Sequence, residues 1–288
     1  MQTSCPTRNP PMLLDVTIKN FALPPMPVDE AAVAAFEQRA RQDLMALGSY
    51  LKDKDNLLDA AAMQEQLFPA VKPDVFLCHA AGDRQQVMQL AVSLEGFGLE
   101  VFVDSCVWGN AYPLLNEIDD HFSRRSDVPG SYRYSKVTRT AASLHMILNA
   151  ALQRMIDGCE LFLHLDTGSV RIEDYVQGGQ HIGAPWALSE CLFARQVARR
   201  GRPRLSLDAF RERNAARPEA SSERSVRFRA PGSSHVLEWA VLERAIEDIR
   251  GLPSSTRWQE GPWFLDHLYG KLRLSDHEKD LLGWQKAA

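Results

Sequence analysis

The feature that most constrains this chain is a strand–helix–strand unit between residues 74 and 103. The segment Asp74–Cys78 is a short apolar run with the length of a buried strand. Asp83 then begins a helix whose apolar residues recur at helical spacing, and Leu99–Val103 is a second strand. Strands joined by one helix form a βαβ unit, because parallel neighbours need a long crossover connection. The unit therefore predicts a parallel sheet.

The rest of the chain continues this alternation. The remaining predicted elements, in chain order, are a short helix over Pro113–Phe122, a polar loop over Ser123–Thr140, a helix over Ala141–Ile156, a strand at Leu161–Leu165, a helix over Pro185–Ala198, a strand at Arg204–Leu207 and an amphipathic helix over His235–Ile249. Alternating strands and helices are typical of the doubly wound α/β class. We therefore predict a flavodoxin-like parallel sheet with helices on both faces.

The two ends of the chain have a different pattern. Residues 1–28 are rich in proline and indicate an irregular arm, and helical patterns follow over Asp29–Leu51 and Asn56–Leu67. The predicted organisation has three parts: a mostly helical N-terminal extension over residues 1–70, an α/β domain over residues 71–210, and a C-terminal helical segment over residues 211–288 that packs on the α/β domain.

Composition and cysteine spacing narrow the class of protein. The formal net charge is −4 over 288 residues, which argues against general binding of polyanions. The five cysteines are scattered and form no CxxC pair, so their spacing indicates neither a zinc site nor a disulfide framework. No apolar run approaches the ~18 residues of a membrane span, and the first residues lack the layout of a signal peptide. We therefore expect a cytoplasmic protein.

Ligands of open parallel sheets bind beyond the carboxyl ends of the strands, so the segments after Cys78, Val103 and Leu165 hold the candidate site. No GxGxxG or GxxxxGK(S/T) pattern occurs there, which argues against a Rossmann dinucleotide site and a P-loop. Trp186 and Glu190 share one face of the helix that follows. Taken alone, such a pair is more often a half-buried Trp beside a solvated Glu than a catalytic site.

Three segments together resemble the Toll/interleukin-1 receptor (TIR) domain. Asp74-Val-Phe-Leu-Cys-His79 followed by Asp83 is similar to the family's opening D-x-F-(I/L)-S-H-x-x-x-D. The segment from Leu99 to Asp104, followed by Trp108, resembles the second strand and loop, G-x-x-V-(F/W)-x-D. Finally, Trp186-Ala-Leu-Ser-Glu190 resembles the W-x-x-x-E motif of enzymatic TIR domains. The three segments occur in the family's order, and the resemblance covers residues 72–210.

The resemblance implies an enzyme that cleaves NAD⁺ at its nicotinamide–ribose bond, with Glu190 as the essential carboxylate. Bacterial TIR proteins of this kind act in anti-phage defence, where NAD⁺ becomes ADP-ribose or a cyclic ADP-ribose signal for a downstream effector. The family also pairs through the loop that corresponds to Asp104–Tyr112. The chain departs from the family at Cys78, which is usually Ser, before Trp186, where a serine is absent, and at the longer connection Ser123–Thr140.

One carboxylate is sufficient for this chemistry. Nicotinamide leaves as a neutral molecule, so its departure requires no strong general acid, and it leaves an oxocarbenium-like centre on the ribose. A carboxylate can stabilise that charge or orient the ribose hydroxyls. NAD⁺ is then the substrate, and we expect neither a further cofactor nor a metal ion.

Six residues near Glu190 are predicted to bind the substrate: His79, Ala80, Asp104, Trp108, Tyr112 and Trp186. Several have structural alternatives that the sequence leaves open. His79 contacts a phosphate or ribose hydroxyl, or bonds to a nearby loop; Asp104 bonds a ribose or caps the loop. Trp108 stacks on the nucleotide or packs the loop against the sheet. Cys78 and Cys106 fit small buried positions better than reactive thiols.

Other features leave function open. Residues 195–229 contain eleven Arg and four acidic residues, a balance of +7 that leaves −11 for the rest of the chain. A solvated basic face explains this better than a nucleic-acid contact, because no aromatic residues interleave with the arginines. His145 and Asn149 share a helix face that could point into the cleft. The alternative functions are a non-enzymatic TIR adaptor that acts by assembly, and an enzyme similar to nucleoside 2-deoxyribosyltransferases, which also break N-glycosidic bonds with a Glu.

Overall fold

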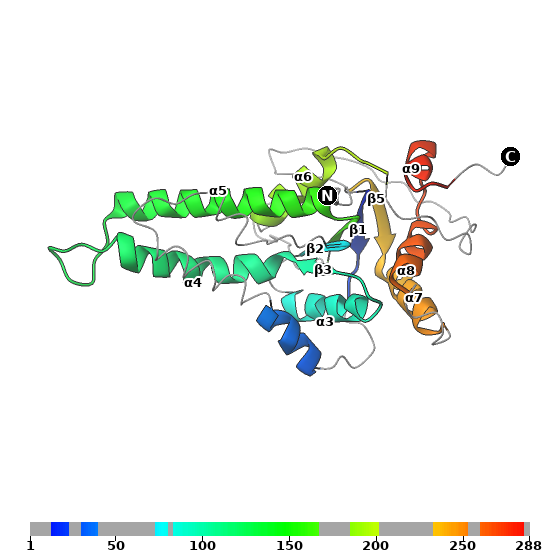
Figure 1. Ribbon diagram of the computed structural model, residues 1–288, viewed down its shortest axis with the longest axis horizontal. Helices are drawn as coiled ribbons and strands as arrows, with labels where there is room; N and C mark the ends of the chain where they lie inside the picture. Colours follow the sequence, from blue (N-terminus) through cyan, green and yellow to red (C-terminus); the bar gives the residue numbers. More distant parts are fainter. Residues whose placement is uncertain are drawn as a thin grey trace, which may run out of the picture.

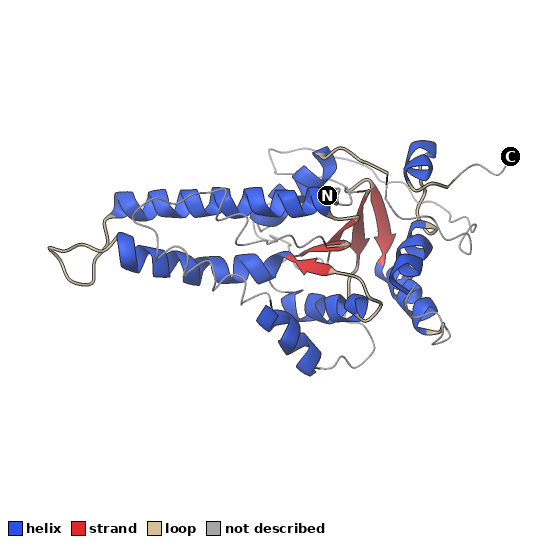
Figure 2. Cartoon of the chain, viewed as in Figure 1, coloured by secondary structure: helices blue, strands red, loops and turns tan. Residues whose placement is uncertain are grey.

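The computed structural model describes residues 13–22, 30–39, 73–79, 83–166, 185–201, 233–252 and 260–284, with the backbone but not the side chains of residues 106–114 and 185–186. Five strands form one sheet in the order β3-β2-β4-β1-β5, and every neighbouring pair is parallel (Figures 1 and 2). The strands are β1 (Leu14–Lys19), β2 (Val75–His79), β3 (Val101–Val103), β4 (Leu161–Asp166) and β5 (His235–Glu238). The predicted flavodoxin-like α/β class is confirmed.

Helices cover both faces of the sheet. They are α3 (Arg84–Glu95), α4 (Asp104–Phe122), α5 (Tyr134–Gly158), α6 (Pro185–Gln196), α7 (Trp239–Arg250), α8 (Glu260–Tyr269) and α9 (Asp276–Leu281), together with a helical stretch over residues 30–39. No helix in the described part of the chain combines the length and apolarity needed to cross a bilayer.

The two faces of the sheet belong to two hydrophobic cores, because successive strand residues point to opposite sides. Val75 and Leu77 of β2 pack with apolar residues of α3, α7 and α8. Phe76 and Cys78 of the same strand pack instead with α5 and α6, and the Phe76 ring stacks on Phe162 of β4 with centroids 5.5 Å apart. The alternation that predicted a buried strand therefore places its side chains in two separate cores.

The prediction of an irregular arm over residues 1–28 is wrong at residues 14–19. These residues form β1, which lies in the interior of the sheet. β1 pairs with β4 on one side, where Leu14 lies opposite Leu161, and with β5 on the other. Its apolar residues Leu14, Val16 and Ile18 all lie in the core. This alternation was present in the sequence, but the surrounding prolines suggested loop structure. The strand between β4 and β5 therefore comes from the N-terminal part of the chain.

The helix predicted over His235–Ile249 begins only at Trp239, because its first four residues form the edge strand β5. The sheet therefore takes strands from each of the three predicted parts of the chain. The helix predicted from Asp29 is helical over residues 30–39, where Arg39 and Glu37 form ion pairs with Glu95 and Arg84 of α3. The helix predicted over residues 56–67 and the strand predicted over residues 204–207 lie outside the described residues.

A long helical hairpin leaves the carboxyl edge of the sheet. The loop predicted over Asp104–Tyr112 is instead the beginning of α4, which starts directly after β3 and continues to Phe122. The loop predicted over Ser123–Thr140 ends at Arg133, because α5 begins at Tyr134. The two helices run side by side away from the strands (Figure 1), joined by a turn with a bridge between residues 124 and 132. With 19 and 25 residues, they are about 28 and 37 Å long.

Candidate functional site

Three neighbouring strands end at the same edge of the sheet because they are parallel, and the candidate site lies there. Cys78 and His79 are the last residues of β2, and Asp104 is the first residue of α4, directly after β3. Glu190 comes from the second turn of α6, which packs against β2 and α5. The fold thus brings together residues from three separated segments, as expected for a ligand site of this architecture.

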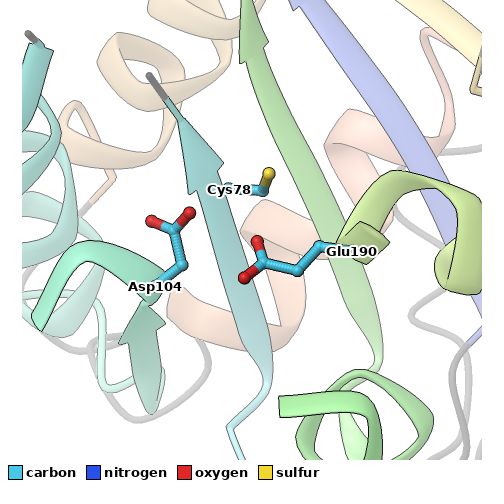
Figure 3. Close-up of side chains that lie close together, drawn as sticks. All are labelled: Cys78, Asp104 and Glu190. Carbon is cyan, nitrogen blue, oxygen red and sulfur yellow. The ribbon is translucent and has the colours of Figure 1, made fainter. Parts of the chain in front are cut away.

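Cys78, Asp104 and Glu190 form a compact cluster (Figure 3). Their thiol and carboxylate atoms all lie within 4.8 Å of one another, and the Glu190 side chain points from α6 across β2 towards Asp104. The three residues are buried, with exposed fractions of 0%, 1% and 1%. Buried carboxyl groups are rare unless they are paired or serve a function. The burial of these three residues therefore indicates that the carboxyl groups are paired or serve a function.

Asp104 and Glu190 form a buried pair of acids. Burial raises the pKa of the Asp104 carboxyl, and the neighbouring His79, the hydrogen bond with Glu190 and two backbone N–H groups lower it by less than burial raises it. A hydrogen bond between two carboxyl groups requires a proton on one of them. The raised pKa of Asp104 means that burial favours its protonated form more than in a solvated carboxyl group. The alternative of a solvated Glu190 does not hold, because its side chain is buried beside Asp104.

Three hydrogen-bonding groups fix the orientation of Asp104. The backbone N–H of Ser105 donates to Asp104 Oδ1 over 2.7 Å, and the backbone N–H of His79 donates to Oδ2 over 3.4 Å. The imidazole Nε2 of His79 lies 2.8 Å from Ser105 Oγ and 3.3 Å from Asp104 Oδ1. The His79 side chain is fully buried. His79 thus bonds to the neighbouring Ser105, and its contact with a phosphate or ribose hydroxyl stays a prediction.

The Cys78 thiol contacts a second cysteine. Burial raises the pKa of the Cys78 thiol well above its usual range, and a hydrogen bond with Cys191 and the nearby Glu190 and Asp104 carboxyls raise it further. The thiol also lies 4.0 Å from the carbonyl oxygen of Ala187 on α6. Cys78 is therefore a protonated, packed thiol, as the expectation of a small buried residue suggested.

The remaining predicted site residues are not all described. Ala80 and the side chains of Trp108, Tyr112 and Trp186 lie outside the described residues, as does that of Cys106. Asn149 accepts a hydrogen bond of 2.9 Å from Ser189 Oγ, so it joins α5 to α6. The expectation that Asn149 points into the cleft receives no support from this contact.

Sequence reasoning missed the partnership of Asp104 with Glu190 and the roles of Ser105 and Cys191. Asp104 and Glu190 lie far apart along the chain, and no local spacing relates them. One signal was available: both residues were expected at the carboxyl edge of the same parallel sheet, where strand ends converge. The fold and site together define an α/β protein with a buried acid pair at the ligand-binding edge of a flavodoxin-like sheet.

Comparison with protein-family models, with curated proteins and with solved structures finds no match for this chain.

Proposed function

We propose that the protein cleaves the N-glycosidic bond of NAD⁺, releasing nicotinamide and giving ADP-ribose or a cyclic ADP-ribose signal, in the manner of the bacterial TIR enzymes of anti-phage defence. The observation that carries the proposal is the position of Glu190, which meets Asp104 at the carboxyl edge of β2 and β3. A carboxylate there can stabilise the oxocarbenium-like ribose as nicotinamide leaves.

The surroundings of Glu190 favour a nucleotide substrate. α4 begins at Asp104, so its N-terminal amide groups and its dipole lie at the same edge as the acid pair. A diphosphate such as that of NAD⁺ is stabilised by such a helix terminus. His79 and Ser105 act through Asp104, which they hold in place, and are therefore positioning residues.

A nucleoside-cleaving enzyme is the second candidate, and the raised pKa of the buried Asp104 favours it. A nucleoside base leaves poorly as an anion, so its departure is helped by a group that protonates it, whereas nicotinamide needs no such help. Burial raises the pKa of Asp104 beside Glu190, which favours a protonated carboxyl group in this pair. Such a pair suits a reaction similar to that of the nucleoside 2-deoxyribosyltransferases. The adaptor alternative does not require two buried acids at the sheet edge.

Incubation of the purified full-length protein with NAD⁺ or with nucleosides, followed by chromatography and mass analysis of the products, tests the proposal. Nicotinamide plus ADP-ribose or a cyclic isomer supports it, and a free base released from nucleosides alone supports the second candidate. If neither substrate changes over long incubation at high protein concentration, both enzymatic proposals fail and the adaptor remains.

Glu190→Gln should abolish NAD⁺ turnover and leave the protein folded. Glutamine has the shape of glutamate and can donate a hydrogen bond to Asp104, so we expect the unfolding free energy to change by only about 1 kcal/mol. Glu160→Gln is the matched control, because Glu160 is also buried but precedes β4 at the opposite edge, where it accepts a hydrogen bond of 3.2 Å from the Tyr269 hydroxyl. Near-native turnover in Glu190→Gln would refute the assignment.

A further inference from the structure

The Cys78–Asp104–Glu190 cluster has a composition that an NAD⁺-cleaving site does not need. The reaction proposed above requires a carboxylate, but no thiol. Here a thiol and two carboxyl groups converge from β2, α4 and α6 (Figure 3), and each is at least 99% buried. Cys78 packs in the core with α5 and α6, but its thiol also lies within 4.8 Å of two carboxyl groups, a set of atoms that can bind a metal ion.

We propose that Cys78, Asp104 and Glu190 form a binding site for one zinc ion, and that zinc inhibits the proposed enzyme. Binding of the ion is independent of the proposed function, whereas the inhibition rests on that function. The types of ligand atom in the cluster indicate which metal ion it binds. Sulfur together with carboxylate oxygen is a donor set that zinc accepts, while magnesium and calcium prefer oxygen ligands alone.

The distances in the cluster fit this ion after small side-chain rotations. Zinc bonds of about 2.0–2.3 Å place neighbouring ligand atoms about 3.3–3.8 Å apart in a tetrahedral site. The candidate ligand atoms already lie within 4.8 Å of one another. The three come from different secondary-structure elements whose backbones are held by the sheet and by packing, so the site needs no refolding.

The neighbours of the cluster support the assignment. Cys191 follows Glu190 on α6 and is hydrogen-bonded to Cys78, so it borders the cluster without belonging to it, and a water molecule is the candidate fourth ligand. His79 Nε2, at 3.3 Å from Asp104 Oδ1, is placed as the outer partner that orients a ligating carboxylate. A zinc ion would also neutralise negative charge that burial otherwise disfavours.

The consequence for activity follows from the sharing of Glu190. A carboxylate bound to zinc cannot stabilise the oxocarbenium-like ribose, because its negative charge is already directed at the metal. The zinc-bound protein is therefore the inactive form, and removal of zinc releases Glu190. The sequence alone gave no indication of this site, because its ligands lie on three separate elements and form no metal-binding spacing.

Titration of the metal-free, full-length protein with Co²⁺ tests the binding. Cobalt replaces zinc in thiolate sites and reports the sulfur ligand through a thiolate-to-cobalt charge-transfer absorption. We expect this band to saturate at one equivalent and to disappear when Zn²⁺ is added. Cys78→Ser should lose the band, and Cys159→Ser, which changes a buried thiol at the end of α5, should keep it. Asp104→Asn should weaken Co²⁺ binding and retain the band at saturation.

Absence of the band from the folded wild-type protein would overturn the site, as would its persistence in Cys78→Ser. Circular dichroism of each variant establishes that the protein is folded, and Asp104→Asn provides an independent test should Cys78→Ser misfold. For inhibition, NAD⁺ turnover by the wild type should be lost on adding Zn²⁺ and restored by a chelator. Turnover that continues with zinc bound overturns the inhibition. A cobalt band in a protein whose metal-free form shows no NAD⁺ turnover refutes the proposed function and leaves the zinc site standing.

Discussion

At the scale of single residues, a second buried charge cluster fixes the strand that sequence reasoning missed. Arg199, beyond the end of α6, donates to Asp15 Oδ1 in β1, and the backbone N–H of Ser234 donates to Asp15 Oδ2 over 2.9 Å. Asp15 is 1% exposed. These contacts tie β1 to two segments that are distant in sequence. The acid of an interior strand is thus satisfied by groups from outside the sheet.

Arg199→Met should lower the unfolding free energy by about 3 kcal/mol, because it leaves the buried Asp15 carboxylate without its cation. Arg200→Met is the matched control: its ion pair with Asp157 is exposed, and its loss should cost less than about 1 kcal/mol. Urea unfolding of the two variants measures the difference. Equal stability losses would contradict the importance of the Arg199–Asp15 contact, and Asp15→Asn combined with Arg199→Met should recover part of the loss.

At the scale of elements, close packing of α8 fixes where this helix lies. A Cβ atom at Gly261 would stand 3.0 Å from the Phe97 carbonyl oxygen and 3.0 Å from Leu99 Cδ2. The first turn of α8 therefore lies directly on the turn between α3 and β3. Only a residue without a side chain permits this approach.

Gly261→Ala should destabilise the protein by about 1–3 kcal/mol, because the added methyl group forces these backbone segments apart. At Gly251 the nearest atoms would be 3.6 Å away, so Gly251→Ala should change stability by less than about 1 kcal/mol. Thermal unfolding of both variants makes the comparison. A Gly261→Ala protein as stable as the wild type would show that α8 can move away at little cost.

The last helix, α9, is joined to β5 through Glu278. Glu278 Oε1 lies 2.7 Å from His235 Nε2, and Oε2 accepts the backbone N–H of Ser275 over 2.7 Å in a capping box. Burial raises the pKa of Glu278, but the hydrogen bonds from Ser275 and His235 outweigh burial and hold it below its usual value. A carboxyl group with a lowered pKa stabilises the fold in its ionised form.

This stabilisation should be present above the unfolded-state pKa of about 4.3 and be lost as the pH falls through the lower pKa of the folded state. Glu278→Gln should therefore be less stable than the wild type at pH 7, by about 1 kcal/mol, and the difference should shrink below pH ~4. Denaturant unfolding at both pH values measures it. Glu247→Gln on the exposed face of α7 is the control. A constant difference across the pH range would contradict the role of Glu278.

At the scale of the whole molecule, the α4–α5 hairpin extends beyond the compact sheet region (Figure 1). Its helices pack through Ile118 and Leu144, while Tyr134 and Met146 of α5 are 80% and 70% exposed. Large exposed apolar side chains suit contact with another protein surface. The segment 104–112, where the TIR resemblance implies self-association, belongs to this hairpin. We propose that any such pairing uses a helix face rather than a flexible loop.

If assembly activates the protein, the specific activity should rise with protein concentration. Trp108→Ala should suppress both this rise and the larger species seen by light scattering, because aromatic residues dominate interface cores. Val236→Ala, which shortens an exposed apolar side chain of β5 outside the hairpin, is the control and should leave the concentration dependence unchanged. Flat specific activity in a monomeric wild type would refute the assembly proposal.

Local patterns of the sequence determined the βαβ unit, the strand at 161–166, the helix from Pro185 and, through these, the α/β class. These features follow from the spacing of the apolar residues that must be buried. This spacing is every two residues in a strand and about every 3.6 residues in a helix. The same patterns placed His79, Asp104 and Glu190 near one sheet edge, because parallel strands end together.

Only the tertiary structure decided the position of β1 between β4 and β5, and the contact of Asp104 with Glu190. The alternating Leu14, Val16 and Ile18 indicate a buried strand, but no local sequence pattern indicates that this strand pairs with β4 and β5. Likewise, the environment of Glu190 depends on how α6 lies across the end of β2. Strand order and helix placement are set by packing of the whole chain, and that packing buries Glu190 beside Asp104, which no local pattern of the sequence indicates.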